Sequence, residues 1–277
     1  MSGGIKLQWR DRNYAEDSHR IYRSDTPMSL SSMPTPIATL TNNVTEYIDY
    51  DVIEGNTYYY RIGAVRGNDE AISDELELIA EEPNFGPGPS DYLSGTSEIG
   101  FFGLVEQSIL SLDTVDLATY IGLTQGTAHN TSTPYLKYSY QGRVIFIAQK
   151  TIRYGLATDH LIPLNAVYGD TEIILGDNTY KLRLMTGGNG DPSTAEGGEW
   201  DALIIPSSNG ILANYTTMEL NAGTNSNGSV TQCQEKLETP LSYSSYVNRG
   251  YNSIQGYGAN ISPTYSFNGW RPVLELI

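Results

Sequence analysis

Alternation between apolar and polar residues is the leading pattern in the first third of the chain. Ile5, Leu7 and Trp9 alternate with small or polar residues, which is the period-two pattern of a half-buried strand. Comparable runs follow at 19–23, 37–40, 45–48 and 52–65. Short strands at this spacing, separated by turn residues such as Glu54-Gly55, predict a small antiparallel β-sandwich over residues 1–82.

The pattern stops at a stretch rich in proline and glycine. Residues 81–91 contain three prolines and two glycines. Proline has no backbone N–H to donate, so this stretch excludes a helix or a central strand. We expect a semi-stiff linker over residues 83–95 that separates the sandwich from a second domain over 96–277.

Mixed periodicities follow the linker and predict a larger α+β domain, so that the whole chain is mainly β. The helix over 113–121 is expected to have Asp113 or Thr114 as its N-cap, with Gly122 just past its end. Gln141-Gly142 supplies the two-residue turn of a hairpin. The other expected elements are strands over 99–105, 136–140 and 144–148, a second hairpin over 172–185, a helix or strand over 199–205, and a buried terminal strand over 273–277.

A polar, aromatic-rich segment precedes the terminal strand. Between Ser242 and Trp270 there are five tyrosines, four asparagines and six serines, and the only formal charge is Arg249. Binding surfaces use this composition because Tyr offers a large contact area at low entropic cost, while Ser and Asn adapt their hydrogen bonds. The segment therefore indicates a display surface on a rigid frame. A surface loop with tyrosines packed beneath it fits the same composition.

Charge and cysteine content narrow the class of protein. The formal net charge is −16, which argues against a nucleic-acid partner because such partners select clustered Lys and Arg. The single cysteine, Cys233, excludes an internal disulfide, and we interpret it as a buried, inert thiol. No run of 18 apolar residues and no signal-peptide pattern is present. We therefore expect that the protein does not insert into a membrane and that it is synthesised in the cytoplasm.

Three features of the first domain resemble a fibronectin type III domain over about residues 4–80. Trp9 matches the core tryptophan of the second strand, Tyr58 matches the tyrosine corner, and 59–65 matches the sixth strand. The resemblance implies a last strand over 72–79 and a spacer role without catalytic residues. Almost nothing precedes Trp9, so the usual first strand is missing or very short. That departure leaves a sheet edge open, which is either an aggregation liability or a docking site.

The second domain carries several short motifs that together resemble bacteriophage virion proteins of the tail-fibre or decoration kind. These motifs lie at 99–103, 120–124, 143–150, 166–169, 179–188, 198–201, 233–235 and 269–276. The layout of Glu199-Trp200, Asn248-Arg249-Gly250 and 269–273 is also similar, more distantly, to C-type-lectin-like folds of the formylglycine-generating-enzyme type. Phage and bacterial variable binding proteins use that frame.

The lectin-like resemblance implies where a ligand would bind. It places the terminal strand 271–277 beside the strand near 99–105, and the segment just before it at the ligand surface. The residues carried over as ligand-binding are Tyr246, Asn248, Tyr251, Asn252, Tyr257, Asn260, Tyr265 and Asn268. The residues expected to build the frame are Trp200, Arg249, Trp270 and Arg271. The enzymatic members of that family need a cysteine pair, whereas this chain has Cys233 alone.

Residues that could support catalysis or bind a metal are sparse, and we expect no enzyme, metal or cofactor. Asp159-His160 could orient an imidazole, but no nucleophile motif accompanies it. The oxygen-rich loop 187–201 could bind calcium, although its spacing matches no EF-hand. A polysaccharide hydrolase would need Glu199 to face Asp201 or Asp191 across a substrate.

These observations favour a structural protein on the surface of a phage virion. We expect it to bind a host-surface glycan or protein through the second domain, to associate with other virion proteins, and to form a homo-oligomer. Capsid or tail decoration without receptor binding is the first alternative, and a polysaccharide hydrolase is the second.

Overall fold

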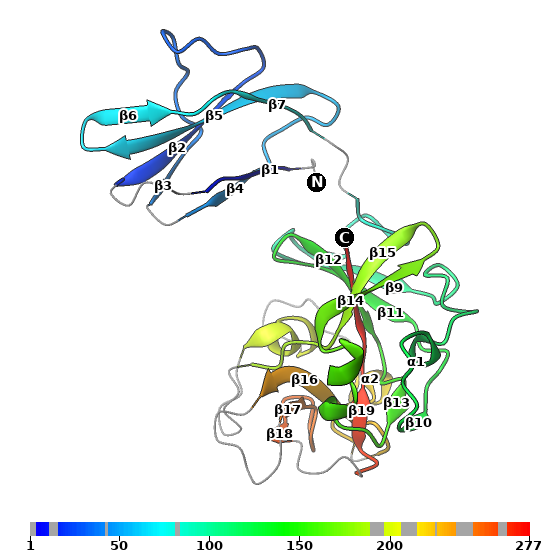
Figure 1. The fold of residues 1–277 in the computed structure, drawn as a ribbon. Helices are drawn as coiled ribbons and strands as arrows, with labels where there is room; N and C mark the ends of the chain where they lie inside the picture. The colour runs from blue at the N-terminus through cyan, green and yellow to red at the C-terminus, as the bar shows by residue number, and fades with distance from the viewer. Residues whose placement is uncertain are drawn as a thin grey trace. The chain divides into compact units, whose positions relative to one another are not determined.

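The computed structural model describes residues 4–10, 16–41, 44–80, 84–188, 197–205, 215–224, 226–236, 246–259 and 265–277. The protein is mainly β, as the sequence predicts, and is built from several largely antiparallel sheets. It divides into two compact units, residues 1–84 and 85–277 (Figure 1). None of the helices in the described ranges has the length and apolar character that a membrane crossing requires.

The first unit contains two small sheets over one core. One pairs β1 (Ile5–Gln8) with β4 (Glu46–Asp49), and the other has the order β3-β2-β5-β6, with β7 also paired to β5. The remaining bounds are β2 (Ser18–Ser24), β3 (Ala38–Thr41), β5 (Thr57–Arg66), β6 (Asp69–Ile72) and β7 (Leu76–Ile79). Ile5, Leu7, Ile21 and Tyr60 are buried between the sheets. Trp9 directly follows β1 and packs, partly buried, against this core.

The last strand of the first unit differs from the prediction. A continuous strand over 72–79 was expected, whereas β6 and β7 are separate and pair with different halves of β5. The side chain of Ser73 accepts a hydrogen bond from Ile62 N at 2.9 Å, in place of a backbone partner. Glu75 accepts another from Met28 N at 2.7 Å. Residues 73–75 lie outside both strands, although Ser73 N still donates to Ile62 O at 2.9 Å.

Tyr58 makes the hydrogen bond that defines a tyrosine corner. Its hydroxyl accepts from the backbone N–H of Ile53 at 2.8 Å, five residues upstream. Close by, Asp49 is buried and accepts from Tyr60 Oη at 2.9 Å and from Arg23 at 2.9 Å. A buried carboxylate is tolerated because both partners compensate its lost hydration.

The second unit contains a seven-stranded antiparallel sheet with the order β14-β15-β20-β12-β11-β9-β8. The bounds are β8 (Ser94–Gly95), β9 (Ile99–Val105), β11 (Tyr135–Tyr140), β12 (Arg143–Ala148), β14 (Tyr168–Leu175), β15 (Asn178–Arg183) and β20 (Val273–Leu276). Both faces of this sheet are covered. Phe146 and Leu274 belong to one core, and Ile145, Ile147 and Val273 belong to another. Burial on both faces explains the uninterrupted apolar run of β12.

A six-stranded sheet completes the second unit, with the order β10-β13-β19-β16-β17-β18. Its only parallel pair among the described strands is β16 with β19. The bounds are β10 (Thr127–Ala128), β13 (Arg153–Tyr154), β16 (Val230–Lys236), β17 (Tyr246–Arg249), β18 (Tyr257–Ala259) and β19 (Asn268–Trp270). This sheet brings the chain just before the terminal strand next to segments from the middle of the unit (Figure 1).

The predicted hairpins are present. Tyr140 pairs with Arg143 across Gln141-Gly142, and both turn residues have positive φ, as a type I′ turn requires. The second hairpin joins β14 and β15, and Leu175 pairs with Asn178 across a two-residue turn. The hairpin signal in the sequence was therefore sufficient, because both turns are local.

Helices are shorter than predicted. The helix expected over 113–121 is a single turn, α1 (Leu117–Tyr120), because Asp116 and not Asp113 or Thr114 is the N-cap, accepting from Ala118 N at 3.0 Å. The 199–205 segment contains a π-helix, η3 (Trp200–Ile204). Further short turns are η1 (Thr158–His160), η2 (Ile162–Leu164) and α2 (Thr217–Leu220).

The lectin-like resemblance implied that the terminal strand pairs beside 99–105, and this prediction is wrong. β20 lies between β15 and β12, with Leu274 opposite both Leu182 and Phe146. Strand β9 instead pairs with β11 and β8. Val273 and Leu274 are fully buried on opposite faces, which only a central position in the sheet provides.

Much of the predicted linker belongs to the second unit. Residues 85–95 fall within that unit, and Phe85 and Tyr92 contact Phe102 with ring centroids 5.5 and 4.4 Å away. The buried ammonium of Lys137 donates to the carbonyls of Pro87 and Pro89 at 3.0 and 2.6 Å. Lys137 lies some fifty residues downstream, so no local pattern indicates this contact.

Candidate ligand-binding surface

Three of the predicted ligand residues are buried in the six-stranded sheet. Tyr246 and Asn248 lie in β17 and Asn268 lies in β19, and each is at most 5% exposed. The two strands flank β16, and every residue of β17 is buried. This corrects the assignment of Tyr246, Asn248 and Asn268 to a ligand surface, because in this structure their side chains are part of the frame.

The other predicted residues lie in different surroundings. Tyr251 and Tyr265 are 41% and 46% exposed, and Asn252 is exposed beside Tyr251. The side chain of Tyr257 and the whole of Asn260 lie outside the described residues. Of the predicted ligand residues, Tyr251, Tyr265 and Asn252 therefore have side chains that are both described and accessible.

Tyr251, Tyr265 and Phe267 form a group that we term the aromatic cluster. The rings of Tyr265 and Phe267 stack at 4.9 Å with 14° between their planes, and Tyr251 meets Phe267 at 6.1 Å and 55°. Phe267 was not predicted; it lies with Tyr265 in a turn that Asn268 N closes by donating to Tyr265 O at 3.1 Å. The structure thus brings together residues from two segments of the predicted surface.

Backbone hydrogen bonds hold both segments of the aromatic cluster. Gly250 adopts a φ of +82°, which lets the chain leave β17 in a tight turn, and its N–H donates to Gly256 O at 2.7 Å. On the other segment, Phe267 O accepts from Val230 N at 2.9 Å. Fixed loops reduce the entropy that a binding surface loses on contact with a ligand.

All four predicted frame residues are buried. Arg271 is fully buried and donates to Ala148 O at 2.8 Å, to Thr231 Oγ1 at 3.0 Å, and to the carbonyls of Gln149 and Leu220. It therefore ties the end of β12 to β16 and α2. Trp200 Nε1 donates to Ile254 O at 2.9 Å, and Arg249 donates to Gly187 O at 2.9 Å. Trp270 is likewise fully buried.

The carboxylates considered for a hydrolase are engaged in ion pairs. Glu199 is 1% exposed, and both of its oxygens accept from Arg183, at 2.6 and 2.7 Å. Asp201 pairs with Arg249 and also accepts from Gly197 N at 2.6 Å. Asp191 lies outside the described residues, as does most of the loop considered for calcium. Within the described ranges, no group of three or more His, Cys, Asp or Glu side chains could hold a metal ion.

Two further reactive residues have local structural roles. Cys233 is fully buried, and burial raises the pKa of its thiol well above the ordinary value, which keeps it protonated. His160 Nδ1 accepts from Ala157 N at 3.2 Å and so closes the short turn of η1. A histidine in a capping position makes this kind of contact with a backbone N–H.

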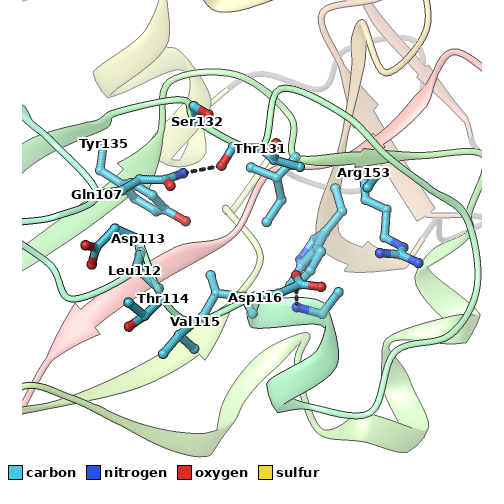
Figure 2. A pocket seen from close by; sticks show the side chains of 15 residues that line it. Gln107, Leu112, Asp113, Thr114, Val115, Asp116, Thr131, Ser132, Tyr135 and Arg153 are labelled. Carbon is cyan, nitrogen blue, oxygen red and sulfur yellow. Dashed lines mark hydrogen bonds between the residues drawn. The ribbon is translucent and has the colours of Figure 1, made fainter.

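A cavity of about 500 Å³ was not predicted from the sequence. Its walls are the segment 112–118 leading into α1, the loop residues Thr131 and Ser132, and Tyr135, Arg153 and Trp270 (Figure 2). Because the sequence assigned Asp113 to a helix, its place on a cavity wall was missed. The polar run 129–133 was the available signal.

Comparison with known proteins adds no family to this picture. The chain matches none of the protein-family models and none of the curated proteins with which we compared it. Its function is therefore inferred from the aromatic cluster, the frame beneath it and the organisation of the two units.

Proposed function

We propose that this chain is a bacteriophage virion structural protein displayed on the particle surface, and that its second unit binds a host-surface glycan or protein through the aromatic cluster. The aromatic cluster is the observation that carries the binding role. Its tyrosines are accessible, while the adjacent strands β17 and β19 are buried. Virion assembly is proposed from the resemblance of the second domain's motifs to tail-fibre and decoration proteins.

The chemistry of the aromatic cluster suits a glycan or a protein surface. Tyrosine and phenylalanine contribute large apolar faces with few rotatable bonds, and a tyrosine hydroxyl adds hydrogen bonding. Such rings dominate the affinity of many interfaces when a rigid surface supports them. The polar neighbours Asn252 and Ser253 are exposed beside Tyr251 and add adaptable donors and acceptors.

The first unit is proposed to be a fibronectin type III-like spacer. The Tyr58 hydrogen bond to Ile53 supports that resemblance. Among the described strands, β1 and β4 pair only with each other, so the outer edge of β1 has no partner strand. We propose that this edge docks onto another virion protein or a second copy of the chain, because unpaired strand edges accept added strands.

Binding of the labelled full-length protein to host cells tests the function. The double variant Tyr251→Ala/Tyr265→Ala should lose affinity by about thirtyfold, since removal of two central aromatic side chains costs roughly 2 kcal/mol or more. Tyr120→Ala is the matched control, because Tyr120 is also exposed, at 48%, but lies on α1. Saturable binding that both variants retain equally would reject the aromatic cluster as the binding site.

The location on the particle needs a separate measurement. Mass spectrometry of purified virions should detect the protein, and its absence would reject the virion assignment.

A decoration protein without a receptor is the alternative, and the burial of Tyr246, Asn248 and Asn268 favours it because these residues contribute packing and no exposed contact. That alternative predicts a protein present on virions whose adsorption is unchanged by Tyr251→Ala/Tyr265→Ala.

A further inference from the structure

The cavity near α1 is lined by one buried polar group that lacks a partner, on Trp270, and by the hydroxyl of a buried tyrosine, Tyr135. Trp270 is fully buried and lines the cavity, and its Nε1 has no hydrogen-bond partner among the described residues. Tyr135 is 1% exposed, its hydroxyl points into the cavity (Figure 2), and burial raises its pKa, which keeps the hydroxyl protonated. A buried donor without a partner is costly, so a ligand oxygen would be stabilised at Trp270 Nε1, and the Tyr135 hydroxyl offers a second donor.

Acceptors and hydroxyls complete the polar lining of the cavity. Gln107 Nε2 donates to Thr131 O at 2.8 Å and to Thr133 O at 3.0 Å, which fixes the side chain and leaves its Oε1 as an acceptor. The carboxylate of Asp113 lies on the same wall as Tyr135 (Figure 2). Thr131 and Ser132 add hydroxyls that both donate and accept.

The charges around the cavity favour a neutral ligand. Both oxygens of Asp116 already accept hydrogen bonds, from Ala118 N at 3.0 Å and Thr119 Oγ1 at 2.8 Å. Asp113 and Arg153 carry opposite charges that offset each other, so this pair favours neither a simple anion nor a simple cation. Arg153 Nε donates to Gln125 O at 2.6 Å, so its remaining N–H groups are held in a fixed position.

We propose that this cavity binds one unit of a neutral saccharide, at a second site distinct from the aromatic cluster. A sugar offers several hydroxyls that donate to Asp113 and Gln107 and accept from Tyr135 and Trp270. Apolar side chains between the polar groups, such as Leu112 and Val115, would contact the carbon faces of the ring. The volume of about 500 Å³ is within the range of small-molecule sites.

A second hollow extends the site. It measures about 440 Å³, shares Thr131 and Ser132 with the first, and is also lined by Asn130, Gln149 and Lys150. The shared wall places the two hollows side by side along one loop. The second hollow therefore has room for the next unit of a saccharide chain, and a disaccharide should bind more tightly than its component monosaccharide.

The indole N–H of Trp270 supplies a direct reporter. The chain of 277 residues contains three tryptophans, so a nitrogen-15-labelled sample gives three indole signals. Glucose, galactose, mannose, N-acetylglucosamine and N-acetylgalactosamine are added separately at millimolar concentration, where a weak site is occupied. At least one sugar should shift the Trp270 signal and leave Trp9 and Trp200 unchanged. No shift with any of the five sugars, or a larger shift with inorganic phosphate, would overturn the proposal.

Conservative variants separate this site from the proposed function. Tyr135→Phe and Asp113→Asn keep the shape of the cavity and should each weaken sugar binding roughly tenfold, as expected for one lost hydrogen bond to a ligand. Tyr251→Ala/Tyr265→Ala should leave the Trp270 response unchanged. If Tyr251→Ala/Tyr265→Ala abolished the Trp270 response while Tyr135→Phe and Asp113→Asn left it unchanged, the sugar would be assigned to the aromatic cluster and the cavity site would be rejected. Because the reporter needs neither virions nor host cells, its result is independent of the proposed function.

Discussion

Lys137 has an ammonium group enclosed within the second unit. The residue is fully buried, its Nζ donates to the carbonyls of Pro87 and Pro89, and the group lies 5.0 Å from the ring of Phe102 and 5.5 Å from that of Phe146. Carbonyl oxygens and aromatic faces compensate the lost hydration of the charge. Burial still lowers the pKa of Lys137 to about 8. This one side chain therefore holds the 85–90 segment against the seven-stranded sheet.

Lys137→Met tests that role, because Met keeps the stem and removes the ammonium. We expect the free energy of unfolding of the second unit to fall by about 2 kcal/mol, since two carbonyls lose a charged donor. Hydrogen exchange at Gly86 and Gly88 should become faster. Urea unfolding and exchange mass spectrometry measure the two effects. Lys181→Met is the control, because Lys181 lies in β15 without these contacts.

The pH dependence of the free energy of unfolding provides a second test of Lys137→Met. The pKa of Lys137 is lower in the folded protein than its ordinary 10.5, so above about pH 8 the unfolded chain binds more protons at this residue. Its contribution to the free energy of unfolding therefore rises with pH across that interval. Lys137→Met should remove this contribution between about pH 8 and 9, below the range in which unfolded tyrosines, with a pKa of about 10, titrate. An unchanged slope would contradict the enclosed ammonium.

Strand β20 is the element that joins the cores of the second unit. Leu274 belongs to the core with Phe146, and Val273 to the core with Ile145. Leu274→Ala should cost about 2–5 kcal/mol of unfolding free energy, because a fully buried side chain is replaced by a void. Ile277→Ala, at a residue 51% exposed, should change it by less than about 0.5 kcal/mol. Equal effects in urea unfolding would contradict a central position for β20.

Elements fixed by neighbouring residues were the predictable part of the fold. The Gln141-Gly142 hairpin and the strands of the first unit follow from turn residues and alternation. The partners of β20 were not predictable, because pairing with β12 and β15 depends on residues about a hundred positions away. The start of α1 was misplaced because Asp113, Thr114 and Asp116 are all good caps, and tertiary packing decides among them.

The ligand surface was predictable in composition but not in exposure. Tyr251 and Tyr265 lie in turns and remain accessible, whereas Tyr246 and Asn248 are residues of the same type in a strand that is covered on both faces. Residue type alone cannot separate these cases. The cavity was missed for a related reason, since Gln107, Tyr135 and Trp270 meet only after three distant segments fold together.

At the scale of the whole molecule, the described residues of the two units form separate cores. The core of the first unit uses residues 5–80, and those of the second use residues 99–274. The net charge of −16 is compatible with display in many copies, because like-charged surfaces resist non-specific association.

Separate cores predict two unfolding transitions, each sensitive to its own residues. Tyr60 is fully buried and donates to Asp49 at 2.9 Å, so Tyr60→Phe removes a partner of a buried carboxylate and should cost about 1–3 kcal/mol in the first transition alone. Leu274→Ala should lower only the second. In the double variant the two losses should add within about 0.5 kcal/mol, because the sites share no partners. Differential scanning calorimetry measures both transitions in one scan. A single transition that both substitutions shift would show that the chain folds as one cooperative unit, and the first unit would then be part of the binding domain's fold and not a spacer.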